Sequence, residues 1–224
     1  MVRSLEAAEW RPGDAIPSEA DLAARFSVSQ GTVRKAIDEM AAENLLVRRQ
    51  GKGTFVATHD DPRSRFRFLR LVHDSGEPHE AQSIPLECWR AKAGAEVARS
   101  LGLETGAPII IVRRLLKFDE RPLVVDEIYL PGDLFQDLSL EILRSSEKSL
   151  YSLFENRYGV HMIRAEERIG AVAADRMSAE LLDVPEGSPL LSVERVTYTY
   201  ANKPVEWRRG LYVTRDFHYF NELT

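Results

Sequence analysis

The sequence contains almost no cysteine and no long hydrophobic run. Cys88 is the single cysteine among 224 residues, so the chain cannot form an internal disulfide framework or a cysteine-rich zinc site. No stretch approaches the roughly 18 apolar residues that a membrane-spanning helix needs. Met1 is followed by mixed charged residues rather than by the apolar core of a secretory signal. We therefore expect a cytoplasmic protein without a membrane partner.

The sequence also lacks the short motifs of common catalytic sites. It contains no nucleophile elbow, no phosphate-binding loop, no HExxH zinc motif and no recognisable Cys/His arrangement. Asp126, Glu127 and Glu206 could serve acid–base chemistry only with suitably shifted pKa values, which a sequence does not reveal. We expect neither an enzyme nor a bound metal or other cofactor.

The remaining composition is that of a folded protein of one or two domains, with 44% hydrophobic and 29% charged residues. The net charge is −5, but residues 1–58 carry eight basic and eight acidic side chains. The whole excess of negative charge therefore lies after residue 58. Within residues 1–58, Arg48, Arg49 and Lys52 cluster around glycines with no acid among them. Such a small basic tip favours local contact with phosphates over broad electrostatic coating.

The first part of the chain is predicted to form short helices. Ser18-Glu-Ala-Asp21 has the form of a capping box, which begins a helix. After a tight turn, Ser29 can cap a second helix over residues 29–42. One face of this second helix is apolar, whereas Gln30 and Arg34 lie four residues apart on another face that is free to contact a partner.

A hairpin and a linker follow. Residues 45–49 and 54–56 are typical of two strands, and the glycine-containing turn between them predicts a winged hairpin. Residues 59–66 are polar and include Pro62, which is typical of a linker between domains. A second domain is therefore expected from residue 67 to residue 224.

The second domain contains an internal repeat. Residues 98–130 align with the residues that lie 81 positions further along the chain, and Arg114 then matches Arg195. Each copy predicts a short helix, a break at glycine and proline, and two strands joined by a tight turn. Two copies are too few for a solenoid, so we interpret them as a duplicated half-domain of an α+β fold.

Arg114 lies within the apolar strand predicted over residues 109–118, where an unpaired guanidinium would be costly to bury. In a simple hairpin Arg114 faces Glu127, whereas one bulge would bring Asp126 opposite it. The sequence leaves this register open. It also leaves open whether Arg114 serves an internal ion pair or a ligand.

Three linked motifs in the first 58 residues resemble the winged helix-turn-helix domain of the GntR family of bacterial transcription regulators. They are Pro17-Ser-Glu-x-x-Leu-Ala23, Phe26-x-Val-Ser-x-x-Thr-Val-Arg-x-Ala-Ile37 and Gly51-x-Gly-Thr-Phe-Val56. The family has a longer first helix, and we expect residues 1–10 to form only a truncated version of it.

The rest of the chain resembles the UTRA effector-binding domain of the HutC-type branch, an antiparallel-sheet domain with the fold of chorismate lyase. The resemblance rests on Arg114-x-Leu116, the hairpin at Pro122, Ser149-Leu-Tyr151, Pro204-Val-Glu206 and Tyr212. It implies a DNA-binding domain over 1–58, a linker over 59–66 and an effector-binding domain over 67–224.

The resemblance implies a ligand-responsive transcription regulator, and we expect a repressor. It would bind a pseudo-palindromic operator in double-stranded DNA as a homodimer and be released or repositioned by a small-molecule effector. In such a domain Arg34 can pair with guanine and Gln30 with adenine, while hydroxyl groups and the wing hold phosphates. The residues expected at the DNA are Ser18, Glu19, Ser29, Gln30, Thr32, Arg34, Arg48, Gln50, Gly51 and Lys52.

The resemblance also implies an effector pocket. Members that bind phosphosugars usually carry a second arginine where this chain has Leu116, so we expect a less anionic effector: a carboxylate, aromatic or sugar-like metabolite. The alternative interpretation is a small-molecule lyase-like enzyme that uses the C-terminal fold. The residues implied at the effector are Arg114, Asp126, Ser149, Tyr151, Glu206 and Tyr212.

Overall fold

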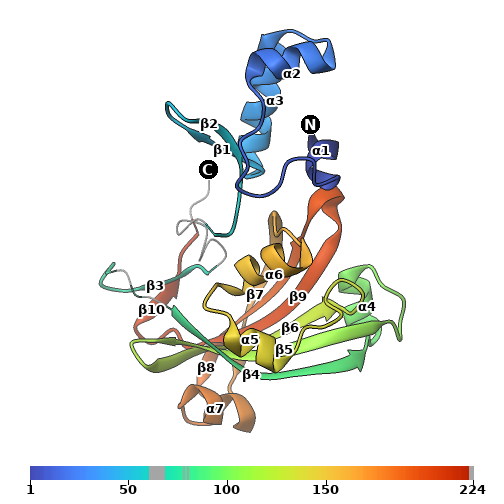
Figure 1. Ribbon diagram of the computed structural model, residues 1–224. Coiled ribbons are helices and arrows are strands. Elements are labelled where there is room, and N and C mark those ends of the chain that lie inside the picture. Colours follow the sequence, from blue (N-terminus) through green and yellow to red (C-terminus); the bar gives the residue numbers. More distant parts are fainter. Residues whose placement is uncertain (61–68, 78, 80, 222–224) are drawn as a thin grey trace.

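The computed structural model describes residues 1–60, 69–77, 79 and 81–221, and Figure 1 shows a small N-terminal unit above a larger sheet. The N-terminal unit comprises α1 (Val2–Glu6), α2 (Glu19–Phe26), α3 (Gln30–Ala42), β1 (Leu46–Arg49) and β2 (Gly53–Val56). The second unit comprises β3 (Leu71–His73), β4 (Ala81–Lys92), α4 (Ala95–Leu101), β5 (Pro108–Phe118), β6 (Arg121–Pro131), α5 (Leu140–Ser145), α6 (Leu150–Tyr158), β7 (Arg164–Ala173), α7 (Arg176–Leu182), β8 (Pro189–Tyr198), the 3₁₀ turn η2 (Tyr200–Asn202), β9 (Pro204–Tyr212) and β10 (Phe217–Tyr219). The α+β class is confirmed.

The helices of the N-terminal unit begin where their caps predict. Ser18 Oγ accepts a hydrogen bond from the Asp21 amide at 3.2 Å, and Ser29 Oγ accepts one from the Thr32 amide at 3.1 Å. Each bond satisfies one orphan donor of a first turn. The apolar faces of α2 and α3 meet in a core with β1 and β2, and the two strands pair antiparallel as the wing. The first helix, α1, has five residues.

The larger sheet is antiparallel in the order β4-β5-β6-β9-β8-β7 within the described residues. The sequence repeat is confirmed, because α4-β5-β6 and α7-β8-β9 are equivalent helix-and-hairpin units. The two hairpins join where β6 pairs with β9, at the middle of the sheet. Equivalent positions of the two copies therefore lie on either side of this central pair.

The register of the first hairpin is decided by a bulge. Asp119 and Glu120 form the turn with φ of 49° and 63°, and the pairing shifts by one residue between Leu116 and Lys117. This shift places Arg114 opposite Asp126, the second of the two registers that the sequence allowed.

The sheet is covered on both faces. Residues such as Ile110 and Val112 of β5 pack with α5 and α6 on one face. Alternate residues, including Ile109 and Leu115, pack with α4 or α7 on the other face. No helix in the described part of the chain is both long enough and apolar enough to span a bilayer.

The two units touch directly. Ile163 belongs to the apolar core of the N-terminal unit, and Tyr200 packs against that core. His59, in the predicted linker, is only 3% exposed and lies against α6, whereas residues 61–66 of that linker lie outside the described residues.

Candidate DNA-binding surface and ligand cavity

The outer face of α3 is exposed. Val33 and Ile37 are buried at 2% and 1% exposure, while Gln30, Thr32 and Arg34 face solvent. The Arg34 side chain is 61% exposed, so a groove of DNA can reach it. This is the arrangement that a recognition helix needs, with one face anchored and the opposite face free.

Glu19 ties the arginines of this surface together. Its carboxylate lies 2.8 Å from Arg34 Nη2 and 3.4 Å from Arg48 Nη1, and Arg48 also pairs with Asp38 at 2.7 Å. The hydrogen bond from Arg34 holds the pKa of Glu19 below its usual value. Glu19 therefore orients two arginines. Its carboxylate would be repelled by a DNA phosphate, so this geometry does not suit Glu19 to contact phosphate directly.

The remaining predicted DNA residues fall into two groups. Ser18 and Ser29 are engaged in helix caps, and the Ser29 hydroxyl also lies 3.0 Å from that of Thr32. Gln50, Gly51 and Lys52 form the exposed tip of the wing, where Gly51 has a φ of +71° that favours glycine. The surface thus consists of α3, the caps and the wing tip.

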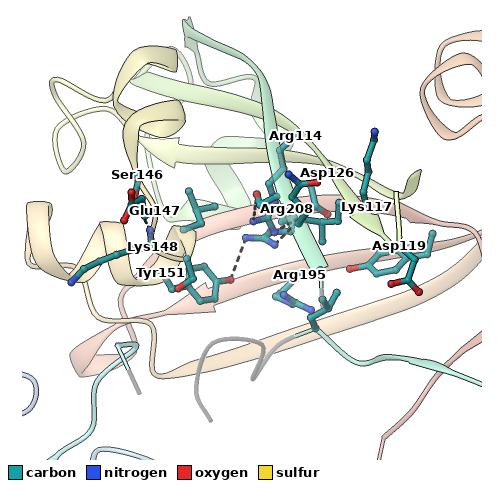
Figure 2. Close-up of a pocket in the computed structure, with 18 of the residues that line it drawn as sticks. Arg114, Lys117, Asp119, Asp126, Ser146, Glu147, Lys148, Tyr151, Arg195 and Arg208 are labelled. Carbon is teal, nitrogen blue, oxygen red and sulfur yellow. Dashed lines mark hydrogen bonds and ion pairs between the residues drawn. The ribbon is translucent and has the colours of Figure 1, made fainter. Parts of the chain in front are cut away.

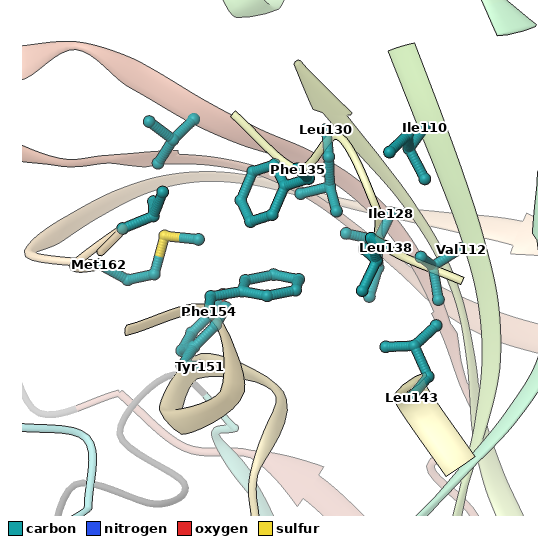
Figure 3. Packing of buried hydrophobic residues seen from close by; sticks show 12 residues of the cluster. Ile110, Val112, Ile128, Leu130, Phe135, Leu138, Leu143, Tyr151, Phe154 and Met162 are labelled. Atoms are coloured by element: carbon teal, nitrogen blue, oxygen red, sulfur yellow. The ribbon is translucent and has the colours of Figure 1, made fainter. Parts of the chain in front are cut away.

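A cavity of about 590 Å³ opens between the sheet and the start of α6 (Figure 2). Strands β5, β6, β8 and β9 supply its charged floor, and the segment 146–151 supplies one wall. Ser149 caps α6, because its hydroxyl accepts from the Ser152 amide at 3.2 Å. Packing of Phe154 on Phe135, with ring centroids 4.6 Å apart, fixes α6 on the sheet (Figure 3).

The floor of the cavity is a buried ion network. Asp126 Oδ2 accepts from Arg114 Nη2 at 2.8 Å and from Arg208 Nη1 at 3.2 Å. Arg208 also donates to Glu206, with its Nε 3.0 Å from Oε1, and the Tyr151 hydroxyl donates to the same Oε1 at 3.0 Å. All five residues have at most 9% exposure, so this network depends on its internal partners.

Protonation in the floor follows from burial and from the arginines. Burial raises the pKa of Asp126, but Arg208 and Arg114 outweigh it and leave the pKa below its usual value. Burial raises the pKa of Tyr151 and of Tyr212. At neutral pH the cavity therefore presents a carboxylate and two phenolic hydroxyl groups. Asp126 Oδ1 is buried and accepts no hydrogen bond from any residue that the structure describes.

Five of the six residues implied at the effector line the cavity: Arg114, Asp126, Ser149, Tyr151 and Tyr212. Glu206 does not line it, because it lies behind Arg208 and Tyr151 and fixes both side chains. Leu116 lines the cavity at the position where a second arginine was considered.

Sequence reasoning missed several basic lining residues, namely Lys117, Lys148, Arg195 and Arg208. The repeat carried a signal for Arg195, because this residue is the counterpart of Arg114 and enters the cavity from the equivalent strand. Arg208 lies two residues after Glu206 on β9, so alternation along that strand places both on one face. Nothing in the sequence pointed to Lys148.

His59, Glu155 and His161 form a buried group whose possible ligand atoms lie within 4.8 Å of one another. Their hydrogen bonds are those of a structural network. The Glu155 carboxylate accepts from Thr58, from the His59 amide and from His161, and His59 Nε2 accepts from the Met162 amide at 3.2 Å. A metal ion would have to displace these donors.

Comparisons with known proteins agree with this architecture. Residues 2–56 match the gntR family of bacterial regulatory proteins, and residues 77–218 match the UTRA domain. The chain is 32% identical to the "Probable transcriptional regulator PhnF" of Escherichia coli K12, over 84% of this chain and 78% of that protein.

Two further comparisons cover most of the chain. The "Probable fructoselysine utilization operon transcriptional repressor" of the same organism is 28% identical, over 88% of this chain and 80% of that protein. A crystal structure of the ligand-binding domain of a GntR-family transcriptional regulator from Bordetella bronchiseptica matches with a TM-score of 0.70 and 47% identity. That match covers 71% of this chain and 99% of the other. These relatives are named as regulators, which agrees with a role other than catalysis.

Proposed function

Because the chain belongs to the GntR family of bacterial regulatory proteins and carries a UTRA domain, we propose that this transcription regulator is a homodimeric repressor. It binds a pseudo-palindromic operator and is released or repositioned by a small molecule in the cavity beneath α6. The division into 1–58, 59–66 and 67–224 is part of this proposal. The observation that carries it is the exposed Gln30/Arg34 face of α3, opposite the buried Val33/Ile37 face.

The DNA-binding part is tested on Arg34. A bidentate arginine–guanine pair contributes about 1–3 kcal/mol of discrimination, so Arg34→Ala should lower the ratio of operator affinity to random-duplex affinity by roughly 5- to 150-fold for each half-site. Lys35→Ala is a matched control, because Lys35 is an 80% exposed cation on the same helix. Fluorescence titration with duplexes selected in vitro by the unaltered protein measures both affinities. If Arg34→Ala discriminates between operator and random duplex as well as the unaltered protein does, the proposal is wrong.

A moderately anionic effector fits the charges of the cavity. Each of the three arginines lining it already has an acidic partner: Asp126 for Arg114, Glu206 for Arg208, and Glu167 for Arg195. The floor is therefore close to neutral, which favours a monocarboxylate over a phosphate dianion. Asp126 Oδ1 adds an acceptor for a ligand hydroxyl or amine, and Leu116 adds apolar surface.

The effector part is tested by binding. Metabolite carboxylates are screened by thermal shift, and each hit is then added to the DNA titration. A true effector changes operator affinity roughly 5- to 150-fold, which corresponds to a coupling of about 1–3 kcal/mol. Tyr212→Phe keeps the ring and removes the hydroxyl group. It should lower the affinity for the compound found in the screen and leave DNA binding without that compound intact. Tight binding of a sugar phosphate in preference to every carboxylate would contradict this effector class.

The exposed edge of the sheet supports the homodimer. β7 is an edge strand, and its uncharged end carries Ile169 and Val172 at 53% and 41% exposure. The opposite edge, β4, is interrupted by Pro85 and a bulge. No strand of the described residues pairs with the outer edge of β7. Such an edge is a template for pairing, and antiparallel pairing of β7 with a second β7 would satisfy two-fold symmetry.

Light scattering after size exclusion tests this dimer. Ile169→Lys with Val172→Lys should convert the dimer to a monomer, because two ammonium groups would be forced into the pairing surface. Met177→Lys is the control, since Met177 is an exposed apolar residue on α7 rather than on β7. A dimer that survives the double change would place the interface elsewhere.

A further inference from the structure

Lys148 stands between the ligand cavity and the segment that leads to the DNA-binding unit. It immediately precedes Ser149, the N-cap of α6, and it lines the cavity. Its ammonium Nζ lies 3.0 and 3.1 Å from the two carboxylate oxygens of Asp60. Figure 2 shows the Lys148 side chain directed away from the Arg114/Arg208 cluster. One residue thus belongs to the rim of the cavity and holds the start of the linker.

The other contacts of this linker segment are also made by α6. Ser152 Oγ donates to the His59 carbonyl at 2.7 Å, and the Asn156 amide donates to Asp60 at 3.2 Å. The Glu155 carboxylate accepts from the His59 amide at 3.2 Å. These contacts arise along the helix, so the start of the linker runs beside the element whose first residues form the cavity wall.

The Lys148–Asp60 pair differs in its exposure from the contacts that Ser152 and Glu155 make. The two side chains are 52% and 39% exposed, whereas Ser152 and Glu155 are buried. Partial burial raises the pKa of Asp60, but hydrogen bonds from Lys148 and Asn156 outweigh it, so Asp60 is an anion at neutral pH. A solvated ion pair is weak and open to exchange. Asn156 is exposed as well, but its side-chain amide is neutral. Of the described contacts to the start of the linker, the Lys148 pair is therefore the one that offers an exposed cation to a competing anion.

We propose that Lys148 is a ligand-binding residue that exchanges between two anions, Asp60 of the linker and the anionic group of the effector. When the effector's carboxylate or phosphate lies at the start of α6, the ammonium group turns into the cavity and leaves Asp60 without its cation. The linker then loses one fastening to α6, and the position of the DNA-binding unit changes. This inference rests on the proposed function, because it assigns the anionic end of the effector and its route to the DNA-binding unit.

The exchange of Lys148 between Asp60 and the effector couples anion binding to the linker contact, and this coupling has the same size in both directions. An exposed ion pair contributes a factor of roughly 1.5 to 5 in an equilibrium constant. Anion binding should therefore loosen the linker by that factor, and loss of Asp60 should tighten anion binding by the same factor.

Hydrogen exchange of the backbone amides of residues 57–60 tests the proposal on the full chain without DNA. Lys148→Gln and Asp60→Asn should each accelerate exchange roughly 1.5- to 5-fold, and the double variant should add nothing to either. Arg157→Gln is the control, because it removes a similarly exposed ion pair of α6, with Asp137, that does not touch the linker.

Acetate and inorganic phosphate serve as probes, each compared with chloride at equal ionic strength so that screening is matched. Acetate should accelerate exchange in the parent but not in Lys148→Gln; phosphate acting instead would identify a phosphate-bearing effector class. An equal response in the parent and Lys148→Gln, no response of the parent to either anion, or additive effects of the two substitutions would overturn the proposal. Failure of the parent to bind any selected duplex would count against the proposed repressor and leave this result standing.

Discussion

Replacement of Asp126 by asparagine removes one charge from the most deeply buried part of the cavity floor. The asparagine keeps the shape of the side chain. Arg208 retains the Glu206 carboxylate, but Arg114 loses its anionic partner. The asparagine oxygen and Ser83 Oγ, at 3.5 Å, can still accept hydrogen bonds from Arg114, but neither carries a charge. The Arg114 guanidinium then carries a positive charge that is neither balanced by a carboxylate nor solvated by water, which is unfavourable.

The expected cost follows from that burial. Asp126 is 0% and Arg114 9% exposed, so the change falls in the range for breaking a buried ion pair, about 3–5 kcal/mol. At roughly 2–4 °C per kcal/mol for a chain of this size, the midpoint of thermal unfolding should fall by about 6–20 °C. Asp137→Asn is the control, since it removes a surface pair with Arg157 that is worth about 1 kcal/mol or less.

Circular dichroism during thermal unfolding measures both variants, and the pH dependence gives an independent check. The pKa of Asp126 is depressed in the folded protein, so its contribution is present above the unfolded value of about 3.9 and is lost as the pH falls through the folded value. The difference between parent and Asp126→Asn should be full at neutral pH and should shrink below about pH 4. The reasoning would be refuted if Asp126→Asn lowered the unfolding midpoint no more than Asp137→Asn does. A stability difference between parent and Asp126→Asn that grows at acidic pH would also refute it.

Three further outcomes are expected. Glu19→Gln should raise affinity for random duplex and lower discrimination in a gel shift, because Arg34 loses its tether and a carboxylate leaves the surface. Lys52→Ala should weaken binding to all DNA sequences alike. If one phosphate contact is lost, the slope of log K against log salt concentration should become less steep by about 0.9, and an unchanged slope would exclude that contact. Gly210→Ala should cost roughly 1–3 kcal/mol in urea unfolding, because the new Cβ would lie 2.6 Å from the Tyr212 ring and 2.7 Å from Asp126 Oδ1. Gly170→Ala is its control, with no atom within 4 Å of the new Cβ, and equal losses in the two would contradict the clash.

The DNA-reading half was predictable because its signals are local. A cap such as Ser29 and its target amide lie three residues apart, and the periodicity of α3 is visible within 13 residues. The exposed face could thus be identified before its surroundings were known. The sequence did not reveal that Glu19 holds Arg34 and Arg48 from 15 and 29 residues away, because such pairs depend on how α2, α3 and β1 pack.

By itself, the sequence determined the caps, the recognition helix, the wing and the duplicated hairpins, since each is encoded by residues close together in the chain. Only the tertiary structure decided which groups share the cavity. The bulge after Leu116 selected Asp126 as the partner of Arg114, and Glu206 proved to lie behind Arg208 rather than at the cavity. The pairing of Lys148 with Asp60 joins residues 88 positions apart. Contacts at such separations follow from strand register and helix docking, which the packing of the whole chain determines.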